Sequence, residues 1–234
     1  ELHCLALTAD GRVLSWGSGL MGALGGGGFG GRRAPTEVTA LRAVGPVVGL
    51  AAGRHHSLAL THTGEAYGWG MCCGMGACEA EPSRQPELGS RASAIGCGDD
   101  YCAALTPAGG VAWGGPQMGA SARLVLPAPA ASAIACGARR LLLLDARGAV
   151  HLSAPLDGHH FLSDLAASSA PTAANTPTSH REALDGAYFL PPPSGTSFVS
   201  IAAGAGLYAA LTAHGDLDVF GDTASLVPLP ALKG

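Results

Sequence analysis

A glycine-rich segment near the start of this 234-residue chain matches the spacing of a cofactor-binding motif. Residues 17–22 read Gly-Ser-Gly-Leu-Met-Gly, which is the Gly-x-Gly-x-x-Gly pattern of dinucleotide-binding folds. In those folds a helix begins directly after the pattern, but residues 25–28 are four consecutive glycines, and glycine disfavours helices. The run also lacks the Gly-Lys-Ser/Thr ending of a phosphate-binding loop. We therefore interpret the segment as a turn and expect no nucleotide cofactor.

Cysteine and histidine residues gather between residues 55 and 78, which raises the possibility of a zinc site. Structural zinc sites use cysteine pairs two to four residues apart, whereas Cys72 and Cys78 are six apart. Cys97 and Cys136 adjoin glycines at the ends of apolar segments, where small core residues belong. We expect reduced, mostly buried thiols in a cytosol-like compartment, with no bound metal and no other cofactor.

Covalent catalysis has little support in the sequence. Serine, histidine and aspartate are common, but no serine lies in the Gly-x-Ser-x-Gly context of a nucleophile elbow. We therefore expect no catalytic residues and a protein that is not an enzyme.

The composition excludes further classes of function. Lys and Arg number 13 against 17 Asp and Glu, a net charge of −4, which gives no electrostatic basis for binding nucleic acid directly. No apolar run reaches the roughly 20 residues that a membrane-spanning helix needs, so we expect no membrane partner. The 36 glycines and 16 prolines make a mainly helical protein improbable.

An internal repeat explains much of the glycine content. Residues 51–70 recur with substitutions, and in four copies a strand-ending glycine is followed eleven residues later by a second one. These pairs are Gly53 and Gly64, Gly98 and Gly109, Gly137 and Gly148, and Gly204 and Gly215. A truncated fifth copy begins at His3.

The spacing within each copy predicts a small antiparallel sheet. An apolar strand ends at the first glycine, a tight loop follows, and a strand of small residues returns. A turn of two residues ending in glycine then supplies the positive φ that a hairpin needs; these turns are Asp10-Gly11, Thr63-Gly64, Arg147-Gly148 and His214-Gly215. Copies separated by roughly 40–50 residues are typical of propeller blades. We predict an all-β propeller with about five recognisable blades.

The repeat resembles that of the regulator of chromosome condensation family. Residues 53–60, Gly-Arg-His-His-Ser-Leu-Ala-Leu, are similar to its first half, and residues 16–25, Trp-Gly-Ser-Gly-Leu-Met-Gly-Ala-Leu-Gly, to its second. The resemblance implies a seven-bladed propeller, of which five units are recognisable here. We consider two alternatives: these residues are part of a longer propeller, or the propeller is reduced and closes by pairing its two ends.

The resemblance divides the chain into three regions. It covers residues 1–153, as propeller repeats, and residues 198–234, as a final repeat. Residues 154–197, rich in Ser, Ala and Pro, are predicted to form an insertion that projects from the rim. The family's repeated histidine is present at His3 and His56, which we expect to bridge backbone groups between strands.

Charged residues recur in the loop after each strand-ending glycine, and the repeat places these loops on one rim. We predict a partner-binding rim that contains Arg54, His55, Asp99, Asp100, Arg139 and Arg140. The resemblance implies contacts of such loops with the small GTPase Ran, and His55, Asp99 and Asp100 occupy the matching positions. The alternative is that these are solvated turn charges.

These observations predict a non-enzymatic scaffold for protein–protein interactions, in a larger eukaryotic assembly such as an axonemal or organellar complex. The alternative function is a guanine-nucleotide exchange factor for a small Ran-like GTPase. We expect a cytoplasmic location, at the cytoskeleton or the cilium, with an organelle or the nucleus as the alternative.

Overall fold

The computed structural model describes residues 3–71, 78–107, 109–114, 123–126, 131–153, 188–190, 194–221 and 226–227, and these residues form five antiparallel sheets. Sheet one contains β1 (His3–Leu7), β2 (Val13–Gly17) and β3 (Arg32–Glu37). Sheet two contains β4 (Val47–Ala52), β5 (His56–Thr61), β6 (Ala66–Gly70) and β7 (Glu79–Arg84). Sheet three contains β8 (Ala94–Cys97), β9 (Tyr101–Thr106), β10 (Gly109–Gly114) and β11 (Arg123–Leu126). Sheet four contains β12 (Ala131–Cys136), β13 (Leu141–Asp145), β14 (Val150–Leu152) and β15 (Tyr188–Leu190). Sheet five contains β16 (Phe198–Ala203), β17 (Leu207–Thr212), β18 (Leu217–Gly221) and β19 (Leu226–Val227).

Each sheet is a simple meander in which strands adjacent in the chain pair with one another. The hairpin glycines have the predicted positive φ: +81° at Gly11, +82° at Gly64, +76° at Gly148 and +91° at Gly215. This confirms that the repeated glycines set the turns between strands. Three short 3-10 turns, η1 (Leu20–Gly22), η2 (Thr39–Val44) and η3 (Pro86–Leu88), lie in the connections. The Gly-x-Gly-x-x-Gly segment contains η1. The residues that follow it form turns and bends, not the helix that a dinucleotide-binding motif requires.

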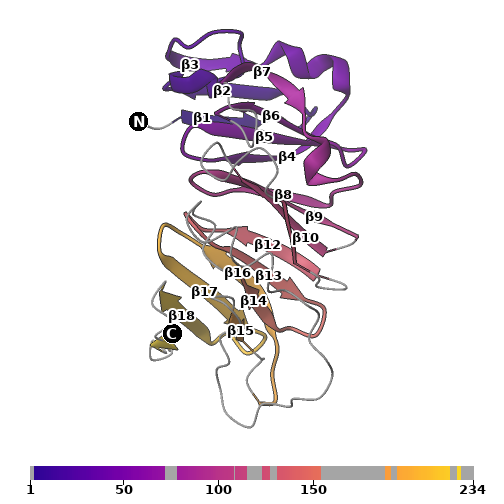
Figure 1. The fold of residues 1–234 in the computed structure, drawn as a ribbon, viewed down its shortest axis with the longest axis vertical. Helices are drawn as coiled ribbons and strands as arrows, with labels where there is room; N and C mark the ends of the chain where they lie inside the picture. Colours follow the sequence, from indigo (N-terminus) through magenta and orange to yellow (C-terminus); the bar gives the residue numbers. More distant parts are fainter. Residues whose placement is uncertain are drawn as a thin grey trace.

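Along the longest axis, sheets one and two lie at one end, sheet three lies in the middle, and sheets four and five lie at the other end (Figure 1). Successive first strands β4, β8, β12 and β16 lie beside one another, as expected for the inner strands of a propeller. Sheet one and sheet five lie at opposite ends of this series (Figure 1). Closure by pairing of the two ends is therefore not seen among the described strands.

The core lies between neighbouring sheets, because the second strand of each inner sheet is covered on both faces. All six residues of β5 are buried, and so are the first five residues of β9. Between sheets two and three, Leu58, Leu60, Leu88, Cys102 and Ala104 form one such core. Small residues on these strands allow two sheets to approach closely, which agrees with the Ala-rich repeat.

The segment predicted as an insertion falls largely outside the described residues. Tyr188–Leu190, which lie inside it, pair with β14 and form the fourth strand of sheet four. No helix among the described residues is long and apolar enough to cross a membrane.

Candidate functional site

The loops after the strand-ending glycines have the same geometry in four sheets. In each, the glycine N–H donates a hydrogen bond to the carbonyl oxygen three residues later. The distances are 2.9 Å from Gly53 to His56, 2.9 Å from Gly98 to Tyr101, 2.9 Å from Gly137 to Arg140 and 2.8 Å from Gly204 to Leu207. Each loop is therefore a closed turn that places its two central residues outside the sheet.

Backbone hydrogen bonds join the loops of sheets three, four and five. The N–H of Asp99 donates to the carbonyl of Ala138 at 3.0 Å, and the N–H of Ala138 donates to the carbonyl of Gly204 at 3.2 Å. The loops of sheets two to five also line one hollow of about 380 Å³, whose wall includes Arg54, Cys97, Asp99 and Cys136. The loops that the repeat assigns to one rim therefore lie around the same hollow.

The predicted rim residues differ in how far they reach solvent. Arg54, Asp99 and Arg139 are exposed, whereas His55 and Asp100 are half-buried. Arg54 and Asp99 line the same hollow, although they come from different sheets. Asp99 is held by backbone hydrogen-bonded to the loop of sheet four, whereas Arg54 lies in the closed turn of sheet two.

Arg140 does not lie where the sequence suggested. Its side chain is buried, and its Nη1 donates a hydrogen bond to the carbonyl of Ser153 at 2.9 Å. Arg140 is the last residue before β13, at the position held by His56 in sheet two. The repeat directs this position into the sheet interior, so Arg140 is not a rim residue.

The histidines at the repeated position connect neighbouring sheets. The Nε2 atom of His56 lies 3.2 Å from the carbonyl oxygen of Tyr101 in sheet three, which confirms its predicted backbone contact. His3 instead contacts a side chain, the hydroxyl of Ser57 at 2.8 Å. Burial lowers the pKa of His56 to about 4 and also lowers the pKa of His3. Both imidazoles are therefore neutral at pH 7.

Tyr101 continues these contacts from sheet three to sheet four. Its hydroxyl donates to the carbonyls of Gly137 at 2.9 Å and Arg140 at 2.7 Å. Burial raises the pKa of Tyr101 well above its ordinary value, so the hydroxyl keeps its proton and acts as a donor. A tyrosine can thus replace the family's histidine while preserving the contact between sheets.

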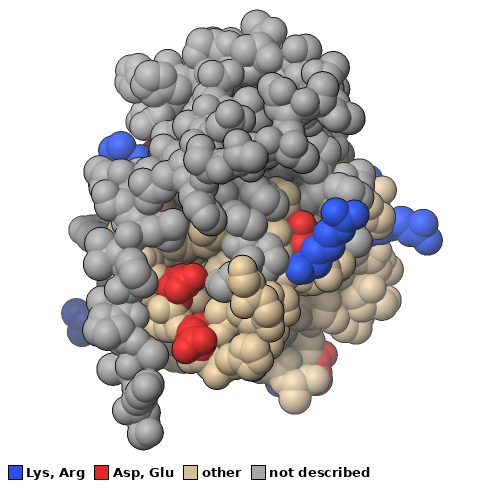
Figure 2. Space-filling model, turned by 90° about the horizontal axis from the view of Figure 1, so that it is seen from below, with Lys and Arg blue, Asp and Glu red and all other residues tan. Residues whose placement is uncertain are grey.

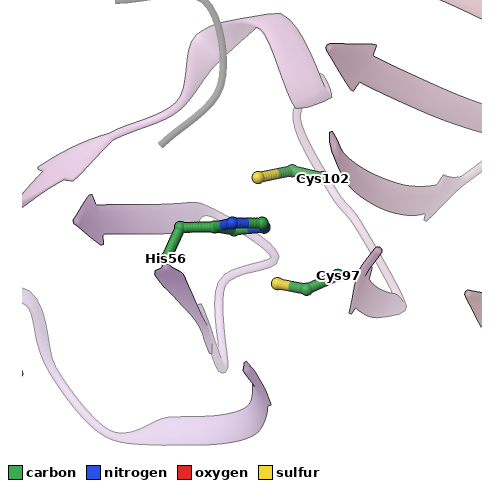
Figure 3. Close-up of side chains that lie close together, drawn as sticks. All are labelled: His56, Cys97 and Cys102. Carbon is green, nitrogen blue, oxygen red and sulfur yellow. The ribbon is translucent and has the colours of Figure 1, made fainter. Parts of the chain in front are cut away.

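The structure brings together one cluster of possible metal ligands that the sequence did not reveal. A ring nitrogen of His56 and the sulfurs of Cys97 and Cys102 lie within 4.8 Å of one another (Figure 3). His56 comes from sheet two and both cysteines from sheet three, so spacing along the chain gives no signal for it. The useful signal is the repeat register, which places Cys97 and Cys102 opposite each other on β8 and β9.

The expectation of reduced, mostly buried thiols is wrong at Cys102, which is not reduced, and at Cys4, which is not buried. Cys102 is disulfide-bonded. Cys4 is exposed, and Cys78, Cys97 and Cys136 are half-buried residues that carry thiols. Around Cys136, desolvation raises the pKa of the thiol to about 12, which keeps it protonated.

Charged side chains are sparse on the described surface. Seen from below, the molecule shows separate acidic and basic side chains. Among the described residues of that face they form no continuous patch of one charge (Figure 2). This agrees with the low charge content of 13%.

Comparison with known proteins identifies the repeat. Residues 10–60 match the model of the regulator of chromosome condensation (RCC1) repeat. This part of the chain is similar to an RCC1 repeat. Human HERC3, a probable E3 ubiquitin-protein ligase, is 37% identical over 117 residues, which are 47% of this chain and 11% of HERC3. RUG3 of Arabidopsis thaliana, a mitochondrial RCC1 domain-containing protein, is 46% identical over 68 residues, 29% of this chain and 15% of RUG3.

Solved structures give the same fold over most of the chain. Human WBSCR16 superposes with a TM-score of 0.68 at 21% identity, covering 94% of this chain and 59% of that protein. The ectodomain of the Physcomitrella patens receptor kinase CR4 superposes with a TM-score of 0.55 at 19% identity. The match covers 94% of this chain and 50% of the ectodomain chain. The predicted all-β propeller of RCC1 type is thus confirmed. The chain spans only 11% of HERC3 and 15% of RUG3, so the matches to these relatives concern their RCC1 repeats.

Proposed function

We propose that this chain is a non-enzymatic module that binds a protein partner through the rim formed by the loops of sheets two to five. The observation that carries the proposal is the linked set of loops around the hollow, with Arg54 and Asp99 exposed on its wall. Loops held by a rigid scaffold are a common place for binding residues. The hydrogen bonds between loops limit the conformational entropy that binding would remove.

The partner that best fits this surface carries charges of both signs. Arg54 and Asp99 offer a guanidinium and a carboxylate around the same hollow, and complementary charges would set the orientation of the partner. The wall between them is lined by small residues and glycines, such as Ala52, Gly98 and Ala205, which permit close approach of another backbone. A protein loop in a larger eukaryotic assembly is the occupant that we propose.

Reversal of the rim charges tests this proposal. Proximity labelling in cells would compare the wild type with the double variant Arg54→Glu/Asp99→Lys, followed by affinity measurement with each purified partner. The matched control is Arg147→Glu/Asp216→Lys, which makes the same charge changes at exposed residues near the opposite end of the strands. We expect at least tenfold weaker binding by the rim variant and unchanged binding by the control. Equal binding by wild type and rim variant would exclude the rim.

The alternative function, nucleotide exchange on a small GTPase, can be measured with purified wild-type protein and variants of the rim residues. Accelerated release of labelled GDP from a Ran-like GTPase by the wild type, lost in Asp99→Ala and Asp100→Ala, would support the exchange-factor alternative. Binding without accelerated release supports the scaffold.

A further inference from the structure

The cluster of His56, Cys97 and Cys102 lies between sheets two and three, and its member Cys97 also lines the rim hollow. We propose that it is a redox-gated site for a thiophilic divalent cation such as Zn²⁺, occupied only when the disulfide of Cys102 is reduced. One imidazole with two thiolates is a ligand set typical of zinc, and the three donor atoms lie within 4.8 Å of one another (Figure 3).

The hairpin of sheet three fixes the two sulfurs on the same face. The N–H of Gly98 donates to the carbonyl of Tyr101, which makes those two residues a hydrogen-bonded pair at the turn. Cys97 and Cys102 form the next pair along the strands, a pair without mutual backbone hydrogen bonds. In such pairs the Cα atoms are only about 4.5 Å apart and both side chains project to one side of the sheet.

The third donor is delivered by the contact between sheets. His56 is buried, and its Nε2 lies 3.2 Å from the carbonyl of Tyr101, next to Cys102 in the chain. A carbonyl that orients the imidazole is the usual second partner of a histidine that binds metal. The position of His56 is therefore set before any cation arrives.

Charge and access favour a divalent cation. Two thiolates neutralise a 2+ ion, so the complex buries no net charge in the apolar layer between the sheets. Cys97 also lines the rim hollow, which offers an entry path and leaves a fourth coordination position open toward solvent. A site with three protein ligands and one open position is a common zinc arrangement.

The disulfide gates the site, because a disulfide sulfur is not a thiolate ligand. A reductant, for which we name a phosphine or a dithiol, supplies two electrons and is itself oxidised, and the Cys102 disulfide becomes two thiols on uptake of two protons. Binding of the cation then displaces the thiol protons of Cys97 and Cys102. Oxidation by the disulfide form of that dithiol, which accepts the two electrons and becomes two thiols, re-forms the Cys102 disulfide and releases the cation.

Co²⁺ titration of the purified chain tests the site, because tetrahedral cobalt with thiolate ligands has intense visible bands and a thiolate-to-metal charge-transfer band. We expect these bands to saturate at one Co²⁺ per phosphine-reduced chain, to disappear on addition of Zn²⁺, and to be absent from the oxidised chain. Absence of the bands from the reduced wild type would overturn the proposal. Equal Co²⁺ binding by the oxidised chain would overturn the gating.

Variants decide whether these residues are the ligands. Cys97→Ser and Cys102→Ser should each remove the charge-transfer intensity that its sulfur supplies and weaken binding at least tenfold. Serine suits position 102, because Ser57 occupies the equivalent position in sheet two. Cys136→Ser is the matched control, since Cys136 lines the same hollow but lies outside the cluster, and it should bind like the wild type. Unchanged bands in Cys97→Ser, a half-buried position that tolerates the change, would refute the site even if Cys102→Ser failed to fold.

Discussion

His56 and Tyr101 occupy the same repeat position in neighbouring sheets, and the imidazole of the first lies 3.2 Å from the backbone carbonyl of the second. Tyr101 in turn donates its hydroxyl to the carbonyl of Arg140, the equivalent residue of sheet four. One position of the repeat therefore links sheet two to three and sheet three to four, although the residue type changes each time. The function of this position is to hold successive sheets together.

This arrangement explains why a glycine lies three residues before His56 and before Tyr101. A Cβ added to Gly98 would overlap the ring of Tyr101, which is held by its hydroxyl and cannot move away. We expect Gly98→Ala to lower the free energy of unfolding by about 1–3 kcal/mol, measured by urea denaturation, because overpacking displaces the ring. Gly204→Ala is the matched control: a Cβ there meets only the Leu207 carbonyl at 3.7 Å, so stability should be unchanged or rise by up to about 1 kcal/mol. Equal losses in both variants would contradict this explanation.

The hydroxyl of Tyr101 is expected to stabilise the contact between sheets three and four. Tyr101→Phe removes the donor to Gly137 and Arg140, which should cost about 1–3 kcal/mol of unfolding free energy. Amide exchange of Gly137, whose N–H bonds to Arg140, should accelerate in the same variant. Tyr67→Phe, a half-buried tyrosine of β6 outside these contacts, serves as the control. Unchanged exchange at Gly137 would show that the hydroxyl does not hold the sheets.

The turns and sheets could be predicted from the sequence because glycine has a local conformational signature. The positive φ at Gly64 and Gly148 follows from the hairpin that the spacing demands. The strand-ending glycines were predicted as turn positions as well, but the reason for Gly98 is a ring that packs over it. That contact depends on side-chain direction, which the repeat alone does not specify.

The candidate site was predictable only in part, because charge does not reveal which way a side chain points. Asp99 and Arg54 lie on the rim as the repeat indicates, since both are central residues of a closed turn. Arg140 is the closing residue of its turn, and the register directs it inward. The cluster around Cys97 joins two sheets, so its recognition required the packing of one blade against the next.

The two adjacent arginines of sheet four should therefore differ in their effects. Arg140→Met removes a buried donor from the carbonyl of Ser153, and we expect a loss of about 1–3 kcal/mol in unfolding free energy. Arg139→Met changes an exposed residue and should alter stability by no more than about 0.5 kcal/mol. Thermal and urea unfolding of both variants provide the comparison. If Arg140→Met kept full stability but lost partner binding, Arg140 would be a rim residue after all.

Buried His56 should make the stability of the metal-free protein depend on pH in mildly acid solution. Its pKa falls from 6.5 to about 4 on folding, mainly because burial penalises the imidazolium, so the unfolded chain binds a proton more readily. The contribution of His56 to the free energy of unfolding is fully present above pH 6.5. It is lost as the pH falls toward 4, and the total loss is about 3 kcal/mol. His3, whose pKa is also lowered, contributes in the same direction.

The contribution of His56 can be separated from that of the carboxylates by comparing two proteins. His56→Gln retains a side-chain donor toward the Tyr101 carbonyl but does not titrate, so its urea unfolding free energy should fall less than that of the wild type between pH 6.5 and pH 4. Asp10 and Glu37, whose pKa values are lowered by hydrogen bonds from Thr8 and Arg42 respectively, titrate in both proteins and cancel in the difference. Parallel pH profiles for the wild type and His56→Gln would mean that His56 takes up its proton without cost in the folded state. Such a result would contradict the neutral, sheet-linking imidazole described here.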